Sequence, residues 1–216
     1  MPEASTFGIF VAAALALLLV PGPAVFYIIA RSVEGGRTAG LVSVLGVEIG
    51  TLVHAAFAAA GLSAILASSA TAFSIVKWLG AAYLVWLGLQ HLLAHGSGDD
   101  EALSVGKEER LYRVFAQSVL VQVLNPKVAL FFLAFLPQFV DASRGAAWTQ
   151  VIVLGVTLAA LGLFTDGLYA LAGGAAGSWL KRKSKDAGLQ RALRYVSGGI
   201  YIALGAANAG AGPSKG

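Results

Sequence analysis

Two short segments of this chain place proline beside glycine or asparagine inside stretches that carry almost no charge. The first is Pro21-Gly22-Pro23 and the second is Asn125-Pro126-Lys127. Proline has no N–H and its ring clashes with the preceding turn, so it interrupts the hydrogen bonds of a helix. Glycine and asparagine are common N-cap residues, and proline is common at the first position of a helix. Each segment is therefore predicted to end one helix and to begin another.

A break of this kind exposes backbone groups that can bind a ligand. The restarted helix offers N–H groups with a partial positive charge, and the interrupted helix offers carbonyls with a partial negative charge. The carbonyls of Leu17, Leu19 and Gln122, about four residues before each break, are expected to lose their usual partners. A zwitterionic amino acid would place its carboxylate on the N–H groups and its ammonium on the carbonyls. The alternative is a plain kink, because proline is common in membrane helices.

Three ionisable side chains fall inside the apolar stretches, where a charge usually marks a pathway or an ion pair. Lys127 could hold a substrate carboxylate, or it could be the structural partner of an acid. Glu48 and Asp166 are the candidate acids, and each could bind an ammonium or take up and release a proton. His54 stands apart from Glu48 on the helix surface, and it is predicted to be a hydrogen-bonded core histidine.

The composition is that of an integral membrane protein. Of the 216 residues, 57% are apolar and 12% are charged, whereas soluble proteins contain about 25% charged residues. No charged residue occurs from Ala4 to Ala30 or from Ile49 to Val76, and each stretch exceeds the roughly 20 residues that cross a bilayer. The chain has no cysteine, which excludes disulfides, thiolate metal sites and thiol redox chemistry.

The apolar stretches predict an all-α fold. Six membrane spans can be drawn, at about 6–30, 39–66, 74–93, 114–140, 147–172 and 195–211. Together they form one transmembrane transporter domain over residues 1–216, with repeat one at about 6–93, a polar cytoplasmic loop at about 94–113 and repeat two at about 114–211. Because each half holds an odd number of spans, the second half must enter the membrane inverted.

Short sequence matches in the same order support this repeat. Val44-Leu45-Gly46-Val47 recurs as Val153-Leu154-Gly155-Val156, and Gly80-Ala81-Ala82-Tyr83 resembles Gly198-Gly199-Ile200-Tyr201. The sequence therefore predicts two inverted three-helix repeats, with spans one and four broken at proline.

Lysine and arginine fall mainly in the first, third and fifth loops between the predicted spans. The side rich in these residues should be cytoplasmic, so both termini are expected on the periplasmic side. This distribution also explains the net charge of +4 without nucleic acid as a partner.

The residues described so far, with several neighbours, resemble the lysine exporter / homoserine–threonine exporter (LysE/RhtB) family over about residues 6–206. The matching motifs are Val20-Pro21-Gly22-Pro23, Gly35-xxxx-Gly40, Gly46-xxx-Gly50 with Val53-His54, Gly80-Ala81-Ala82-Tyr83-Leu84-xxx-Gly88, Asn125-Pro126-Lys127, Phe131-Phe132, Leu136-Pro137-Gln138-Phe139 and Asp166-xx-Tyr169-Ala170.

The resemblance implies a multi-pass exporter of amino acids or close analogues in the bacterial inner membrane, driven by the proton motive force or another cation gradient. It assigns the substrate site to Pro21, Gly22, Pro23, Asn125, Pro126, Lys127 and Asp166. Many family members carry aspartate at the position of Thr51, so Glu48, one helical turn earlier, is an alternative to Asp166 for the coupling cation.

The sequence therefore predicts a secondary exporter that alternates access around its broken spans. We expect it to be embedded in the lipid bilayer, to be no enzyme and to need no cofactor. Because six spans make a thin bundle, a homodimer is plausible. The alternative is a cation or metal exporter or channel that uses Glu48, Asp166 and the free carbonyls. A central Lys127 opposes that alternative, because it repels cations.

Overall fold

The computed structural model describes residues 3–61 and 107–183, together with Trp78, Ala82, Val85, Trp86, Leu89 and Gly199. All the regular elements in these two ranges are helical. The predicted third and sixth spans, and with them the matched segments 80–83 and 198–201, lie outside the continuously described ranges.

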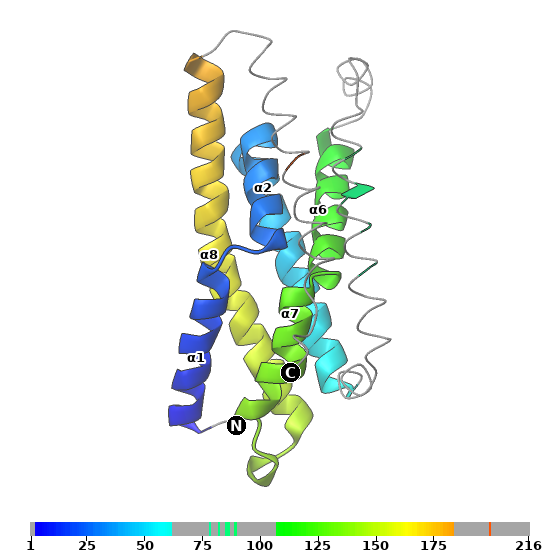
Figure 1. Cartoon of the computed structure of the whole chain (residues 1–216), viewed down its shortest axis with the longest axis vertical. Helices are drawn as coiled ribbons and strands as arrows, with labels where there is room; N and C mark the ends of the chain where they lie inside the picture. The colour runs from blue at the N-terminus through cyan, green and yellow to red at the C-terminus, as the bar shows by residue number, and fades with distance from the viewer. Residues whose placement is uncertain are drawn as a thin grey trace.

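The first break lies where the sequence predicts it. Helix α1 (Ala4–Leu19) ends at an extended Val20, and α2 (Pro23–Ala59) begins after Gly22, which is also extended. Figure 1 shows α1 running from the N-terminal end to mid-height, where a short loop crosses to the start of α2. Proline at the first position of α2 has no N–H to bond backwards, so the two helices cannot join.

Helix α2 is a hairpin of two helical segments. Gly36 has a φ of 77° and a ψ of −175°, a conformation that glycine adopts without the steric cost of a Cβ. Ala24 and Ile28 pack in one buried cluster with Val44 and Val47, which a straight helix would hold tens of ångströms away. Residues 23–35 therefore rise from the break, and residues 37–59 descend beside them (Figure 1).

The second break joins α6 (Lys107–Val123) to α7 (Pro126–Leu130). The stretches on its two sides, Arg110–Val123 and Pro126–Phe139, are bent by 44° relative to each other. Beyond α7 the chain continues as a π-helical turn, η1 (Phe131–Phe135), and a 3-10 turn, η2 (Leu136–Phe139). Pro137 lies where the winding changes, because it cannot donate a helical hydrogen bond. Helix α6 begins earlier than predicted, since charged residues at 107–110 can be helical outside the hydrocarbon layer.

A short 3-10 turn, η3 (Ala142–Arg144), leads to α8 (Ala147–Lys183). At 37 residues this helix is about 55 Å long, well beyond the roughly 30 Å of a hydrocarbon core. It continues past the predicted end near residue 172 because the helix does not stop where the apolar part of the sequence ends. By length and composition, α2 and α8 can cross a membrane, and the bent pair α6–α7 is a third candidate.

Two pairs of glycines allow α2 to pack closely against its neighbours. The face of Gly46-xxx-Gly50 lies on α6, where a Cβ at Gly50 would stand 2.6 Å from the Cβ of Gln122. The face of Gly173-xxx-Gly177 on α8 lies on the first segment of α2, where a Cβ at Gly173 would stand 3.3 Å from the carbonyl oxygen of Ile29. Small residues of this kind let membrane helices approach.

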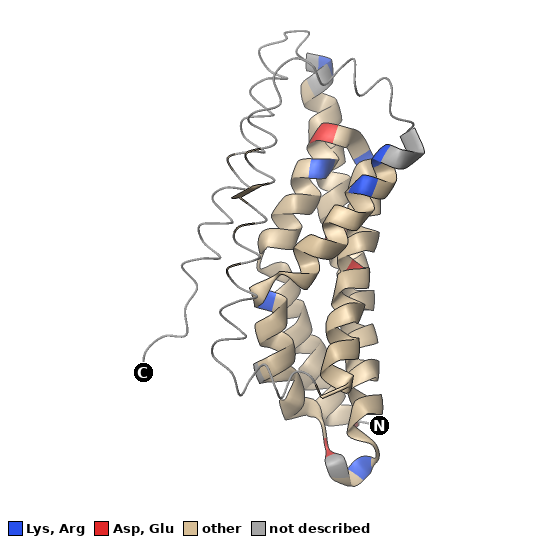
Figure 2. Cartoon of the chain, turned by 90° about the vertical axis from the view of Figure 1, so that its right-hand side faces the viewer, with Lys and Arg blue, Asp and Glu red and all other residues tan. Residues whose placement is uncertain are grey.

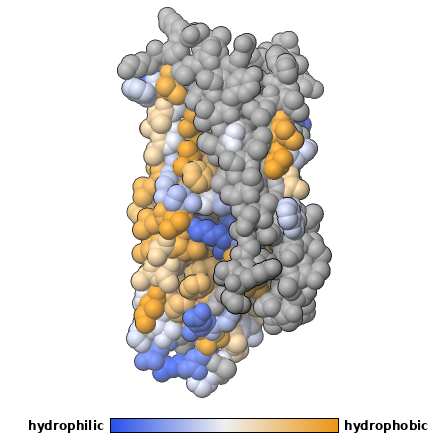
Figure 3. All heavy atoms as spheres, viewed as in Figure 1, coloured by the Kyte–Doolittle hydropathy of each residue, from blue (hydrophilic) through white to orange (hydrophobic). Residues whose placement is uncertain are grey.

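Charge and hydropathy follow the long axis of the molecule. Figure 2 shows lysine and arginine gathered mainly at one end, a smaller charged group at the other end and few charges between. In Figure 3, apolar side chains cover most of the described surface at mid-height, and hydrophilic ones gather at the lower end. This is the distribution of a membrane-spanning bundle.

Candidate functional site

The carbonyl end of α1 is bound by side chains from the second half of the chain. The Nζ of Lys127 donates to the carbonyl of Leu17 at 2.6 Å and also to the carbonyl of Val20. The hydroxyl of Tyr169 on α8 donates to the carbonyl of Leu19 at 3.3 Å. The last turn of a helix has no backbone donors for these carbonyls. The prediction that Leu17 and Leu19 lose their helical partners is confirmed.

The start of α2 faces the same lysine. Gly22 is the N-cap of α2 and supplies no side-chain hydrogen bond, so the first N–H groups of this helix have no cap from that residue. A Cβ on Gly22 would lie 3.0 Å from the Cδ of Lys127. The missing side chain therefore leaves room for the lysine stem to pass between the two ends of the break.

The second break is held by Asn125. Its Oδ1 accepts a hydrogen bond from the backbone N–H of Lys127 at 3.1 Å, which is an N-cap of α7. Its Nδ2 donates to Oε1 of Gln122 at 3.1 Å, and the Nε2 of Gln122 donates to Oγ1 of Thr51 at 2.8 Å. This buried chain of side chains ties the break to α2 and fixes the backbone that carries Lys127.

His54 has the structural role that the sequence suggested. Its Nε2 lies 3.1 Å from the carbonyl oxygen of Gln122, which is the third carbonyl predicted to lose its helical partner. The imidazole also stacks on the ring of Phe132, with the ring centroids 5.7 Å apart. His54 therefore supports the second break from α2.

Glu48 and Asp166 meet each other across α2 and α8. The two residues are only 5% and 3% exposed, and their carboxyl groups lie within hydrogen-bonding reach of one another. A hydrogen bond between them requires a proton on one of the two groups, since a carboxylate can only accept. Gly162 on α8 makes room for the pair, because a Cβ there would stand 2.7 Å from the Cδ of Glu48.

The second oxygen of Asp166 is unsatisfied. Its Oδ1 is buried and has no hydrogen-bond partner in the described part of the chain. Lys127 is near enough to interact with Asp166 electrostatically, but the ammonium is bound by carbonyls, and in the described ranges it forms no ion pair with a carboxylate. The alternative that Lys127 is the fixed ion-pair partner of an acid therefore does not describe this conformation.

A small cavity of about 30 Å³ joins the two breaks. It is lined by residues of both breaks and of α8: Leu17, Leu18, Gly22, Ala24, Val25, Gln122, Asn125, Lys127, Val128 and Asp166. Sites that bind small molecules usually have volumes of roughly 300–1,000 Å³, so the cavity in this conformation is too small for an amino acid. Admitting one requires the elements around the cavity to move apart.

The structure thus brings four predicted site residues onto one cavity: Gly22, Asn125, Lys127 and Asp166. Glu48 reaches this cavity through Asp166. The prolines shape the backbone instead, since Pro23 and Pro126 begin helices and Pro21 is exposed in the loop.

Sequence reasoning missed the side chain of Gln122 as a bridge, Tyr169 as a cap and Gly162 as the space for Glu48. Only Tyr169 gave a signal beforehand, since it lies one helical turn after Asp166.

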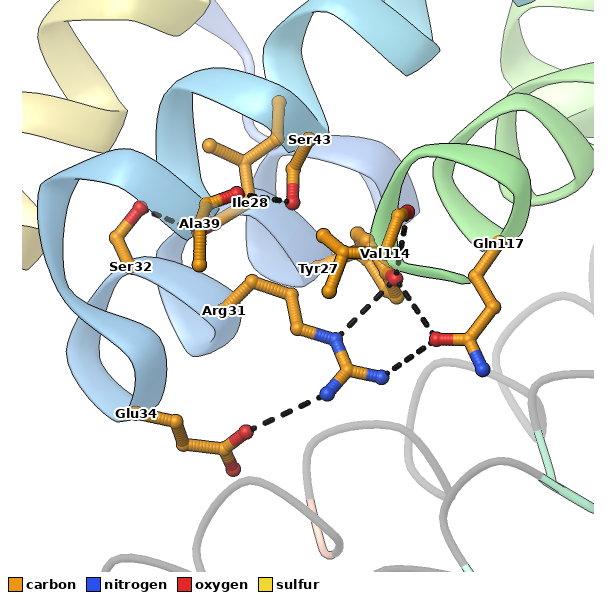
Figure 4. A network of polar contacts seen from close by, with 9 residues as sticks. All are labelled: Tyr27, Ile28, Arg31, Ser32, Glu34, Ala39, Ser43, Val114 and Gln117. Atoms are coloured by element: carbon orange, nitrogen blue, oxygen red, sulfur yellow. Dashed lines mark hydrogen bonds and ion pairs between the residues drawn. The ribbon is translucent and has the colours of Figure 1, made fainter. Parts of the chain in front are cut away.

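A second polar cluster joins the two halves nearer the end rich in lysine and arginine (Figure 4). The guanidinium of Arg31 donates to Oη of Tyr27 at 3.2 Å and to Oε1 of Gln117 at 2.7 Å, and it pairs with Glu34 at 3.7 Å. The hydroxyl of Tyr27 also donates to Oε1 of Gln117 at 3.2 Å. These contacts tie the first segment of α2 to α6.

Comparison with known proteins gives one consistent family. The model of the LysE type translocator family matches residues 15–209. The homoserine/homoserine lactone efflux protein of Salmonella typhimurium is 30% identical over 190 residues, which cover 88% of this chain and 89% of that protein.

Two further relatives agree with this assignment. The leucine efflux protein of an Enterobacter species is 30% identical over 187 residues, covering 87% and 88% of the two chains. A membrane protein of Vibrio cholerae, described as uncharacterized, is 35% identical over 144 residues, covering 67% and 69%. No solved structure matches the chain.

Proposed function

Because the chain belongs to the LysE type translocator family, whose named relatives are efflux proteins and not enzymes, we propose that it is a secondary exporter of amino acids or close analogues. The observation that carries the proposal is the cavity between the two broken helices. In the apolar part of the bundle, this cavity brings together the ammonium of Lys127, the end of α1, the start of α2 and an unsatisfied carboxyl oxygen of Asp166. These groups are complementary to the two charges of an amino acid.

The substrate carboxylate is bound by Lys127 and by the N–H groups at the start of α2, where the helix dipole is positive. The substrate ammonium is bound by Asp166, whose Oδ1 is unsatisfied. The relatives are named for homoserine, homoserine lactone and leucine. All three carry an α-amino group, whereas the lactone has no free carboxylate, so recognition of the ammonium is the common requirement.

The proposed membrane topology has six spans in two inverted repeats, of which the described ranges contain spans one, two, four and five. Spans one and four are broken at mid-height and run in opposite directions (Figure 1), which is the arrangement expected of broken helices in inverted repeats. Rocking of one repeat against the other gives alternating access. The end rich in lysine and arginine is cytoplasmic and both termini are periplasmic, in an inner membrane. A homodimer is the proposed assembly.

The proposed coupling ion is a proton held by Glu48 and Asp166 together. A hydrogen bond between them requires a proton, and Asp166 also lines the cavity. Entry of a substrate ammonium beside Asp166 would favour the ionised carboxylate and release the proton, which links export to the proton motive force.

Counterflow in proteoliposomes tests this function. Vesicles loaded with unlabelled leucine, homoserine, homoserine lactone, lysine or glutamate are diluted into the same labelled compound. We expect the wild-type protein to accumulate label for at least one substrate with an α-amino group. Lys127→Ala should reduce the rate at least tenfold, while Arg144→Ala, in an exposed loop, should leave it unchanged.

If no compound of the panel gives counterflow, or if Lys127→Ala exchanges at the wild-type rate, the proposal is wrong. Flux of metal ions without counterflow of amino acids would support a cation exporter instead.

A further inference from the structure

The ammonium of Lys127 occupies a binding site made by the backbone of another helix. Two carbonyls at the end of α1, those of Leu17 and Val20, accept hydrogen bonds from Nζ. This end of a helix carries a partial negative charge and favours a cation. The residues therefore form a site for a primary ammonium group, and in this conformation the occupant is a side chain of the protein itself.

We propose that the carbonyl end of α1 is the ammonium subsite of the transport site, and that Lys127 fills it only while substrate is absent. The proposal rests on the function proposed above and adds an exchange of partners. The α-ammonium of the substrate replaces Nζ on the carbonyls of Leu17 and Val20. The released Nζ then binds the substrate carboxylate or, for a substrate that has none, Asp166.

The unsatisfied oxygen of Asp166 supports this exchange. Asp166 is 3% exposed, its Oδ1 has no partner, and it lines the same cavity as Leu17 and Lys127. Because the ammonium of Lys127 is hydrogen-bonded to α1, this buried oxygen is left without a hydrogen-bond donor. An arriving ammonium would lie between the freed carbonyls and Asp166, so both would be satisfied at once.

The space around the lysine stem also supports it. Gly22 has no side chain where a Cβ would stand 3.0 Å from Cδ and 3.5 Å from Nζ of Lys127, so the stem has room to leave α1. The backbone of Lys127 is held separately, because Asn125 caps its N–H. The side chain can therefore change partners while α7 stays in place.

Removing Lys127 exposes these carbonyls whether the lysine is a fixed cap or an exchangeable occupant. Chemical rescue therefore tests the ammonium site itself, and the response of the wild-type protein tests the exchange. Lys127→Ala removes three methylene carbons and the ammonium, and n-butylammonium supplies an ammonium on an apolar chain of similar length. The readout is the thermal unfolding midpoint of the purified full-length protein in detergent. We expect Lys127→Ala to lower the midpoint by several degrees, and millimolar n-butylammonium to restore at least half of that loss.

The controls are n-butanol, which has the same chain without the charge, and Arg144→Ala, which changes a cation far from the cavity. Neither n-butanol with Lys127→Ala nor n-butylammonium with Arg144→Ala should shift the midpoint. The wild-type protein should respond less than Lys127→Ala, because the amine must displace Nζ.

If Lys127→Ala does not fold, Lys127→Met keeps the stem and is tested with methylammonium, with methanol as the uncharged control. Rescue by the alcohol as strong as by the amine, or no rescue in the folded variant, would overturn the proposal. The outcome is independent of the counterflow assay. Rescue without counterflow would mean that the ammonium site exists but that the protein does not export amino acids. Counterflow without rescue would mean that the protein is an exporter that binds the substrate ammonium elsewhere.

Discussion

The two broken helices satisfy the backbone groups exposed at their breaks in different ways. At the second break, Asn125 caps α7 with its own side chain, and the backbone N–H groups of Leu124 and Asn125 still reach the carbonyls of Leu120 and Gln122 at 3.0 Å each. At the first break, Gly22 offers no cap, and the carbonyls at the end of α1 depend on Lys127 and Tyr169. The second break is closed mainly by its own residues, with added contacts from Thr51 and His54 of α2. The first break takes its donors from the second half of the chain.

This difference separates a rigid part of the site from an exchangeable part. Contacts within a few residues survive when helices move against each other, whereas contacts between α1 and α7 or α8 are lost when these helices separate. The second break is therefore suited to hold Lys127 in place. The first break is suited to accept new partners, and among them the proposed substrate.

Asn125→Ala is expected to have the largest effect on stability, because it removes the local closure of the second break. Losing the N-cap costs about 1 kcal/mol, and leaving Oε1 of Gln122 without its donor costs about 1–3 kcal/mol more. The free energy of unfolding, measured by denaturation in mixed micelles, should fall by the sum of these two costs. Added n-butylammonium should not restore it, since the α1 carbonyls keep Lys127.

Thr157→Ala is the matched control, since among the described residues its hydroxyl bonds only within its own helix, to the carbonyl of Val153. The comparison between the breaks fails if Asn125→Ala costs no more than this control, or if an amine restores its stability.

Gly162→Ala is expected to change coupling while it leaves both breaks intact. The new methyl group would stand 2.7 Å from Cδ of Glu48 and would push this flexible side chain away from Asp166. If the two carboxyl groups share the transported proton, separating them should shift the pH profile of exchange in proteoliposomes away from that of the wild-type protein. Gly167→Ala on the same helix is the control, because no described atom lies within 4 Å of its Cβ position. Superimposable profiles of Gly162→Ala and wild type would argue against a shared proton.

Tyr169→Phe is expected to have the smallest effect. It removes one borrowed donor of the first break, the hydroxyl on the carbonyl of Leu19. A single hydrogen bond contributes about 0.5–1.5 kcal/mol, and Leu19 is 62% exposed, so the lower end of that range applies. The unfolding midpoint should fall by a degree or two, with Tyr112→Phe, on an exposed tyrosine of α6, as the reference. A loss as large as that of Asn125→Ala would mean that the first break is not the exchangeable one.

Local features of the fold could be read from the sequence. Proline acts on its own turn, so both breaks and the freed carbonyls of Leu17 and Leu19 were predictable. The carbonyl of Gln122 was also predicted to be freed, but it accepts a hydrogen bond from the backbone N–H of Asn125 at 3.0 Å. Glycine at 36 lies between the predicted ends of spans one and two, and the structure reverses the chain there. Helix α8 runs further than predicted because hydropathy marks the apolar layer and not the end of the helix.

The partners at the site could not be predicted, because they come from distant parts of the chain. The sequence left Lys127 open between a carboxylate ligand and an ion-pair partner, and in the structure it binds carbonyls of α1. It treated Glu48 and Asp166 as alternatives, whereas their carboxyl groups lie within hydrogen-bonding reach of each other. That contact needs the space at Gly162, and the local sequence pattern of α8 does not predict that Glu48 would fill this space.

The central claim is that substrate binds between the two breaks, and cysteine protection tests it directly. The chain has no cysteine of its own, so Leu18→Cys places a single thiol on the cavity and Ala146→Cys places one in the exposed loop before α8. The rate of labelling with a small methanethiosulfonate is measured in membranes with and without an amino acid that the counterflow assay shows to be transported. We expect the substrate to slow labelling at position 18 severalfold and to leave position 146 unchanged. Equal labelling at position 18 with and without substrate would contradict a binding site between the breaks.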